Sequence, residues 1–195
     1  MSGIGSLREA LQDNARVLAD ALTLLRFLIA LAIVLCALSA NPGLLPGVIM
    51  LVLAGWTTDI IDGNLARADR DGRKSWVGDH EFLADVALMY SSLLYFMSAG
   101  YLPFLPYLLY MLYAAAVAAI SMNMSYAMAV SAPVAASAPI MAFVHARPLG
   151  WVFLGWLALH LLCNWQRFRR EVTDFIRGCL LYTSDAADDL LCVDL

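Results

Sequence analysis

Charged residues are scarce in this chain, and that scarcity limits the class of protein. Only 14% of its 195 residues are charged and 62% are hydrophobic, well above the roughly 45–50% apolar content of soluble domains. No stretch alternates with the two-residue period of an outer-membrane strand, so any membrane spans are predicted to be helices rather than barrel strands. The composition therefore predicts an all-α, polytopic integral membrane protein.

Cysteine motifs are also lacking. The four cysteines show no CxxC spacing and do not cluster with histidine in the sequence. They therefore indicate neither a metal site nor a disulfide framework. Cys36 and Cys163 are interpreted as small apolar residues within spans.

Six apolar segments approach the ~20 residues that a helix needs to cross a bilayer. The predicted transmembrane helices are Ala21–Ala40, Leu44–Ile61, Phe82–Ala99, Leu102–Ile120, Tyr126–Val144 and Leu149–Trp165. Pro133 and Pro139 interrupt the fifth segment, where we expect a kink. Residues 1–20 carry leucine and alanine at helical spacing and are predicted to form an amphipathic juxtamembrane helix.

The positive charges indicate an orientation, because cytoplasmic segments carry the excess of Lys and Arg. They precede the first span, lie between the second and third, or follow the sixth, with Arg147 on the other side and Arg26 inside the first span. Both termini and the 65–81 loop are therefore expected on the cytoplasmic side. A six-helix domain would cover residues 21–178.

The last segment of the chain, Cys179–Leu195, differs from what precedes it. Its four aspartates account for the net charge of −4, since residues 1–178 hold twelve basic and twelve acidic groups. Its first ten residues resemble the translation of a transposase adapter from sequencing libraries, and the segment is interpreted as non-native. The alternative is an acidic disordered tail.

Two aspartates stand where a membrane helix should tolerate none. Asp59 and Asp62, in "WTTDIIDGNLAR", follow an unbroken apolar run. A carboxylate in a span costs ~2.5–3.5 kcal/mol on insertion scales, so it marks a site facing the bundle interior or a water-filled cavity. Gly63, Ala66 and Arg67 continue the same face, and the two small residues leave room for a ligand to approach the backbone.

A second acidic pair opens the third span. Glu81 and Asp85 lie at i and i+4, one above the other on a helix face. If the second and third spans are antiparallel neighbours, four carboxylates converge and require protons or cations. Oxygen ligands favour magnesium, manganese or calcium over zinc. A basic rim of Arg67, Arg70, Arg73 and Lys74 then favours phosphoryl transfer.

These residues resemble the motif of the CDP-alcohol phosphotransferase family, D-x-x-D-G-x-x-A-R followed by G-x-x-x-D-x-x-x-D. The first half matches at every defined position, from Asp59 to Arg67. In the second half Glu81 stands at the third aspartate, and Val77 at the glycine with Gly78 one place late. Asp79 is a possible substitute ligand.

The resemblance implies the roles of these residues. Asp59, Asp62 and Glu81 would bind two Mg²⁺ or Mn²⁺ ions that hold the pyrophosphate of a CDP-alcohol, and Asp85 would bind metal or act as general base. Gly63 and Ala66 would line the CDP pocket, and Arg67 would hold the polar network. The enzyme would transfer a phosphatidyl or other phosphoalcohol group to an acceptor hydroxyl in phospholipid biosynthesis, releasing CMP.

Several alternatives stay open at this point. The chain could be an inactive family member or an ion- or solute-transporting membrane protein, and a homodimer is possible from small-residue spacing in the fourth span. Arg26 either snorkels to the interface or pairs with a carboxylate or phosphate. His160 and Asn164 are interpreted as interhelical hydrogen-bonding residues. No nucleic-acid partner is indicated, and the acceptor alcohol is not identified.

Overall fold

A computed structural model describes residues 15–68, 80–120, 124–165, 168–170 and 172–173. Within those residues the regular elements are all helical, which confirms the predicted all-α class. The helices are α2 (Ala15–Ser39), α3 (Leu45–Ala68), α4 (Glu81–Ser98), α5 (Phe104–Ile120), α6 (Met124–His145) and α7 (Arg147–Cys163), with a short 3₁₀ turn η1 (Pro42–Leu44) between α2 and α3.

Each predicted span coincides with one of these helices, but the start of the first differs from the expectation. The first helix begins at Ala15 and continues without a break into the apolar segment, so no boundary separates a juxtamembrane helix at residue 20. The fifth span forms one continuous helix through both Pro133 and Pro139. The expected kink there stays a prediction. Residues 1–14 of the expected amphipathic helix lie outside the described residues.

Two stretches of the structure are long and apolar enough to cross a membrane, Val17–Ser39 and Pro42–Ile61. The other four helices contain shorter apolar stretches of 10–17 residues. The outer face of α2 supports a lipid environment, because Leu24, Leu28, Leu31, Leu35 and Leu38 are all more than half exposed along it. A soluble monomer rarely exposes so continuous an apolar stripe.

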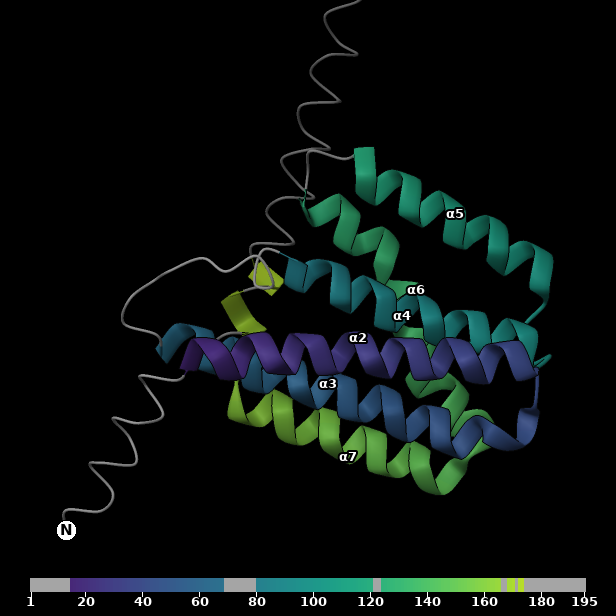
Figure 1. The fold of residues 1–195 in the computed structure, drawn as a ribbon, viewed down its shortest axis with the longest axis horizontal. Helices are drawn as coiled ribbons and strands as arrows, with labels where there is room; N and C mark the ends of the chain where they lie inside the picture. The colour runs from purple at the N-terminus through teal and green to yellow at the C-terminus, as the bar shows by residue number, and fades with distance from the viewer. Residues whose placement is uncertain (1–14, 69–79, 121–123, 166–167, 171, 174–195) are drawn as a thin grey trace, which may run out of the picture.

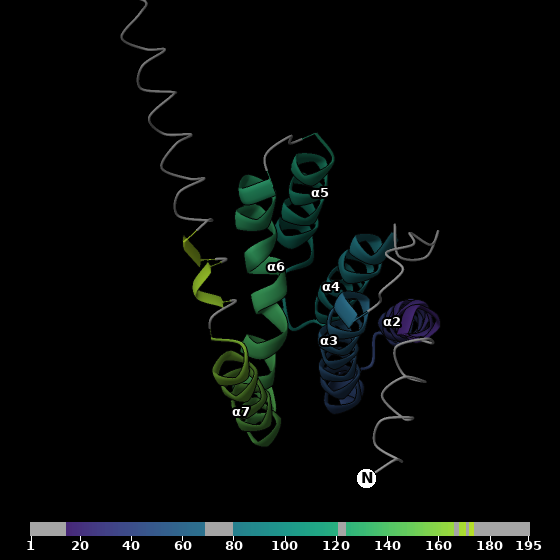
Figure 2. The ribbon, with the colours of Figure 1, turned by 90° about the vertical axis from the view of Figure 1, so that its left-hand side faces the viewer.

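The helices form two groups that meet at α6. In the first group α2 packs along both α3 and α4, and in the second α6 packs against α5 and α7 (Figure 1). The end-on view places α3 and α4 between α2 on one side and the α5–α7 group on the other (Figure 2). Contacts of α6 with α3 and α4, and of α7 with α3, join the two groups.

Glycines allow two of these helix pairs to approach closely. A Cβ atom built on Gly55 in α3 would lie 2.5 Å from Cδ2 of Leu88 in α4, and Leu88 is itself buried. A Cβ on Gly150 in α7 would lie 2.6 Å from the Cα of Phe143 in α6. A Cβ at Gly55 would therefore require the tip of the Leu88 side chain to move, and a Cβ at Gly150 would require the backbone of Phe143 to move. The absence of a Cβ therefore sets the spacing of α3 against α4 and of α6 against α7.

Hydrogen bonds fix the α2–α3 connection at one end of the bundle. The hydroxyl of Tyr95 donates to the carbonyl of Asn41 at 2.9 Å, and that of Tyr101 to the carbonyl of Pro42 at 2.9 Å. Ala40 adopts a positive φ of 48° where the chain leaves α2. The turn is thus held against the C-terminal end of α4, which leaves the N-terminal end of α4 and the C-terminal part of α3 at the opposite end of the bundle.

Candidate active site

A buried arginine connects three helices at that opposite end. The side chain of Arg26, on α2, is fully buried, with an exposed fraction of 0%. Its Nη1 atom lies 3.4 Å from Oδ1 of Asp59 on α3 and hydrogen-bonds Oδ1 of Asp85 on α4. The sequence left open whether Arg26 snorkels or pairs. The structure shows that it pairs with two carboxylates.

The burial of the two sides of this cluster is unequal. The side chains of Asp59 and Asp85 are 46% and 35% exposed, respectively. The guanidinium is therefore enclosed by protein while both carboxylates keep one side open to a ligand. Because removing the partner of a buried charge leaves that charge uncompensated, the three side chains are expected to hold one another in place.

Helix packing explains why the two carboxylates meet. Gly55 lies one turn before Asp59 on α3, and Leu88 lies one turn after Asp85 on α4. The close approach of Gly55 to Leu88 therefore brings the two helices together next to the acidic pair. The hydroxyl of the buried Thr58 donates to the carbonyl of Gly55 at 2.7 Å, so this polar group is satisfied within α3.

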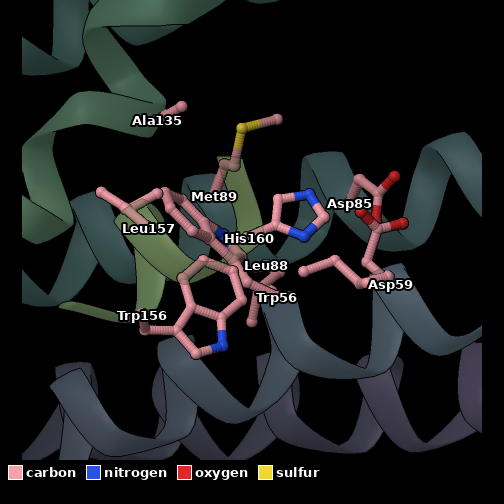
Figure 3. Close-up of a pocket in the computed structure, with 10 residues that line it drawn as sticks. Trp56, Asp59, Asp85, Leu88, Met89, Ala135, Trp156, Leu157 and His160 are labelled. Carbon is pink, nitrogen blue, oxygen red and sulfur yellow. The ribbon is translucent and has the colours of Figure 1, made fainter. Parts of the chain in front are cut away.

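Asp59 and Asp85 also line a pocket of about 340 Å³ between the two helix groups. Its wall is mostly apolar (Figure 3). The described residues around it are Trp56, Asp59 and Ile60 of α3, Asp85, Leu88 and Met89 of α4, Ala135 of α6, and Trp156, Leu157 and His160 of α7. The pocket is therefore bounded by both groups of helices, with acidic side chains from α3 and α4 alone.

Aromatic contacts fix α7 against α3 on one side of the pocket. The ring of Trp56 lies 5.2 Å from that of Phe153, edge to face, and 6.1 Å from that of Trp156. Trp156 in turn stacks on the imidazole of His160, with ring centroids 5.8 Å apart and planes 18° apart. These contacts position His160 as part of the pocket wall.

The hydrogen bond of His160 differs from the expectation. It was predicted to pair between helices, but its Nδ1 atom lies 3.1 Å from Nδ2 of Asn164, one turn later along the same chain. The same Nδ2 donates to the backbone carbonyl of His160 at 3.2 Å. With this amide NH₂ group as the donor, Nδ1 accepts, and the neutral ring carries its proton on Nε2. This tautomer leaves an N–H group on the far side of the ring.

The remaining predicted site residues are placed only by their position along the chain. Asp62, Gly63, Ala66 and Arg67 belong to the last two turns of α3, and Glu81 is the first residue of α4. Their side chains lie outside the described part, as do residues 69–79 with Arg70, Arg73, Lys74, Val77, Gly78 and Asp79, the residue Arg167, and the segment 174–195. His80 directly precedes α4 and is half-buried.

The chemistry of the acidic pair fits a divalent cation. Asp59 and Asp85 already converge on one positive group, the guanidinium of Arg26, from two different helices. Their oxygen atoms are the ligands that magnesium and manganese prefer. Among the side chains that the structure describes, no group of three His, Cys, Asp or Glu residues lies close enough to hold a metal. Completing such a site would require Asp62 or Glu81.

Sequence reasoning missed the wall of the pocket that faces the acids. Trp56 lies one turn before Asp59, a spacing that could have indicated it. Ala135, Trp156 and Leu157 carry no comparable signal, because apolar residues are expected throughout a membrane helix. His160 was noticed as a polar residue in an apolar segment, but it was not assigned to the site.

Fold and site together define an all-helical protein with a buried arginine–carboxylate cluster at one end of the bundle and an apolar pocket beside it. A model of the family described as CDP-alcohol phosphatidyltransferase matches residues 16–166. The chain belongs to this family, which confirms the resemblance found in the sequence motif. No curated protein and no solved structure matches the chain.

Membership of the family establishes the general class of the protein. The family consists of membrane-integral transferases that act on CDP-alcohol donors and alcohol acceptors and generally depend on divalent metals. The match covers α2 to α7, including both halves of the acidic motif and the histidine of the pocket.

Proposed function

We propose that the chain transfers a phosphatidyl or other phosphoalcohol group from a CDP-alcohol, such as CDP-diacylglycerol, to an acceptor hydroxyl and releases CMP. The observation that carries this proposal is the convergence of Asp59 and Asp85, the first and last acids of the motif, on one buried guanidinium beside a pocket. Membership of the family supports the class of reaction.

The proposed site would hold two Mg²⁺ or Mn²⁺ ions on Asp59, Asp62 and Glu81, with Asp85 as a further ligand or as the general base. Bound divalent ions would neutralise the donor pyrophosphate and stabilise the departing CMP. Glu81 retains the charge and oxygen atoms of an aspartate with one additional methylene. Asp79 is the alternative ligand at this end of α4.

The chain's own residues would then bind the substrate and accept the proton. Gly63, Ala66 and Arg67 would bind the CDP group along the last turns of α3, and the basic residues Arg70, Arg73 and Lys74 would attract its phosphates. Asp85, which is 35% exposed on the pocket side, can accept the proton of an attacking hydroxyl. Arg26, which is buried, would hold the side chains of Asp59 and Asp85 in position.

The proposed arrangement in the membrane has six spans, with both termini and the acidic end of the bundle on the cytoplasmic side. The excess of Lys and Arg before α2, after α3 and after α7 supports this orientation. A donor lipid could keep its acyl chains in the bilayer while its head group reaches the site. The proposed reaction would belong to membrane phospholipid synthesis.

The test is release of CMP by the purified full-length chain in detergent. We expect release from CDP-diacylglycerol to require both an alcohol acceptor and Mg²⁺ or Mn²⁺, and to stop when EDTA is added. A panel of glycerol 3-phosphate, inositol phosphate, serine, glycerol and alkyl glycerols covers the acceptor classes. Metal binding without CMP release from any member of the panel would instead favour an inactive or transporting protein.

A further inference from the structure

The wall of the pocket that faces the acids comes from helices outside the acidic motif. Ala135 on α6, together with Trp156, Leu157 and His160 on α7, lies across the pocket from Asp85 and Leu88 of α4 (Figure 3). This wall contributes large apolar surfaces and one polar ring. Its composition is therefore suited to select what reaches the carboxylates.

The described lining of the pocket favours one kind of acceptor. Among the described residues that line the pocket there is no lysine or arginine, whereas two carboxylates face into it. These residues offer no basic side chain to the anionic group of a phosphorylated alcohol. An alcohol with an apolar body would instead lie against Trp56, Trp156, Leu157 and Met89.

Two polar groups in the same wall can hold a hydroxyl. Nε2 of His160 carries a proton when Nδ1 accepts from Asn164, so it can donate to a hydroxyl oxygen. Pro139 has no N–H to give to the carbonyl of Ala135, four residues earlier in α6, so this carbonyl lacks its usual partner in the helix. His160 and Ala135 both line the pocket together with the acidic pair.

The direction of the reaction assigns this pocket to the acceptor. In a phosphoryl transfer the attacking and leaving oxygens lie roughly in line. Under the proposed function, CMP leaves on the Gly63–Arg67 side of the acids, towards the C-terminal end of α3. The attacking hydroxyl must then come from the opposite side, where Trp56 and the pocket lie.

We propose that the pocket between α3, α4, α6 and α7 is the acceptor site and that it selects an uncharged hydroxyl on an apolar body, that is, a lipid alcohol. The inference rests on the proposed function. The acceptor oxygen forms a bond to the phosphorus that carries the donor's alcohol, and the bond from that phosphorus to the bridging oxygen of CMP breaks. CMP leaves with the electron pair, and the hydroxyl proton goes to Asp85.

Three acceptors that share a glycerol backbone test this selection in the unmodified full-length chain: glycerol, glycerol 3-phosphate and 1-O-octylglycerol. We expect the KM of octylglycerol to be at least about tenfold below that of glycerol, because burial of two methylenes alone accounts for about that factor. Glycerol 3-phosphate should be no better than glycerol. A preference for glycerol 3-phosphate, with CMP still released, would overturn the inference while leaving the proposed function intact.

A pair of variants on α6 separates the acceptor from the donor. Ala135→Leu fills part of the pocket, whereas Ala132→Leu adds the same volume at an exposed position one turn earlier that does not line it. We expect Ala135→Leu to raise the KM of octylglycerol about tenfold with the KM of CDP-diacylglycerol unchanged. The control should change neither. Both proteins are compared in one detergent, so partition of the acceptor cancels.

Three results would contradict the inference. A rise in the KM of the CDP-diacylglycerol donor alone would assign the pocket to the acyl chains of the donor. Unchanged constants for Ala135→Leu would show that the pocket holds neither substrate. If this variant does not fold, the acceptor series on the unmodified chain decides by itself. Absence of CMP release with all acceptors, including the wider panel above, would remove the proposed function as well.

Discussion

Arg26 shows how one residue can be costly and useful in the same position. A guanidinium with an exposed fraction of 0% carries a buried positive charge that needs a negative partner. Asp59 and Asp85 provide this partner. The same arrangement stops two neighbouring carboxylates from repelling each other. A cation in the protein thus keeps the acidic cluster assembled whether or not a metal is bound.

Replacement of Arg26 by glutamine should therefore destabilise the protein and make it dependent on metal. We expect a loss of about 3 kcal/mol in the free energy of unfolding without divalent ions, at the low end for a broken buried pair because both carboxylates are partly exposed. Mg²⁺ should restore part of it, since a metal on Asp59 and Asp85 replaces the missing charge.

The control is Arg147→Gln, which removes an exposed arginine from the first residue of α7. Its effect should stay within about 0.5 kcal/mol. Denaturant unfolding in detergent, with and without Mg²⁺, measures both variants. An equal loss for the two, or no response of Arg26→Gln to Mg²⁺, would show that Arg26 does not compensate the acidic pair.

Residue chemistry was the most predictable part of the site. Asp59, Asp85 and Arg26 could be singled out from the sequence because a charge in an apolar segment is costly and requires a reason. His160 was noticed for the same reason, but the side of the helix that it occupies and its bond to Asn164 depend on packing. The apolar wall residues gave no signal, since apolar residues cost nothing in a membrane helix.

At the level of elements, glycines decide how closely the helices approach. Gly150 in α7 packs against the backbone of Phe143 in α6, and the backbone cannot move aside as a flexible side chain can. The contact lies at the end of the α6–α7 hairpin that is remote from the acids. The separation of these two helices in turn sets the position of the pocket wall that carries Trp156 and His160.

Substitution of Gly150 by alanine should therefore cost stability although alanine favours helix. We expect a loss of about 1–3 kcal/mol, typical of overpacking. Gly155→Ala is the matched control in the same helix, because nothing lies within 4 Å of its added Cβ. That control should be neutral or gain up to about 1 kcal/mol from helix propensity. Thermal unfolding of both proteins measures the difference, and a neutral Gly150→Ala would refute the close contact.

Helix existence could be predicted from the sequence, whereas helix ends could not. Every predicted span corresponds to a helix, because the runs of apolar residues are long. The start of α2 at Ala15 escaped prediction, since a change from amphipathic to apolar sequence alters the surroundings of a helix without breaking its hydrogen bonds. Periodicity also does not reveal which helix covers a given face.

For the whole molecule, the topology in the bilayer is the prediction to test. The six-span proposal places Asn41, in the α2–α3 turn, and Lys74, between α3 and α4, on opposite sides of the membrane. Single cysteines introduced at these positions in a cysteine-free chain should react with an impermeant maleimide from opposite sides in intact vesicles. Labelling of both from the same side would contradict the topology.

The arrangement of the two helix groups is the feature that sequence alone could not supply. The free-energy cost of placing carboxylates in an apolar segment indicated the acidic end of α3 and α4. Only the packing of the helices shows that α7 lies beside α3, through contacts of Trp56 with Phe153 and Trp156. This contact turns an acidic cluster into a pocket with an apolar wall. A polar cluster at the membrane surface and an enclosed reaction site would have the same sequence signature.

The central claim is that the acidic end of this bundle transfers a phosphoalcohol group, and it is tested most directly by CMP release from the variant Asp85→Asn. This change keeps the shape of the side chain but removes its charge and its capacity to accept a proton. With Mg²⁺, CDP-diacylglycerol and octylglycerol, we expect the rate to fall about 10²–10⁴-fold, the usual contribution of a general base. Arg147→Gln, at the other end of the bundle, should retain the full rate. Release of CMP by Asp85→Asn at the rate of the unmodified protein would contradict the account.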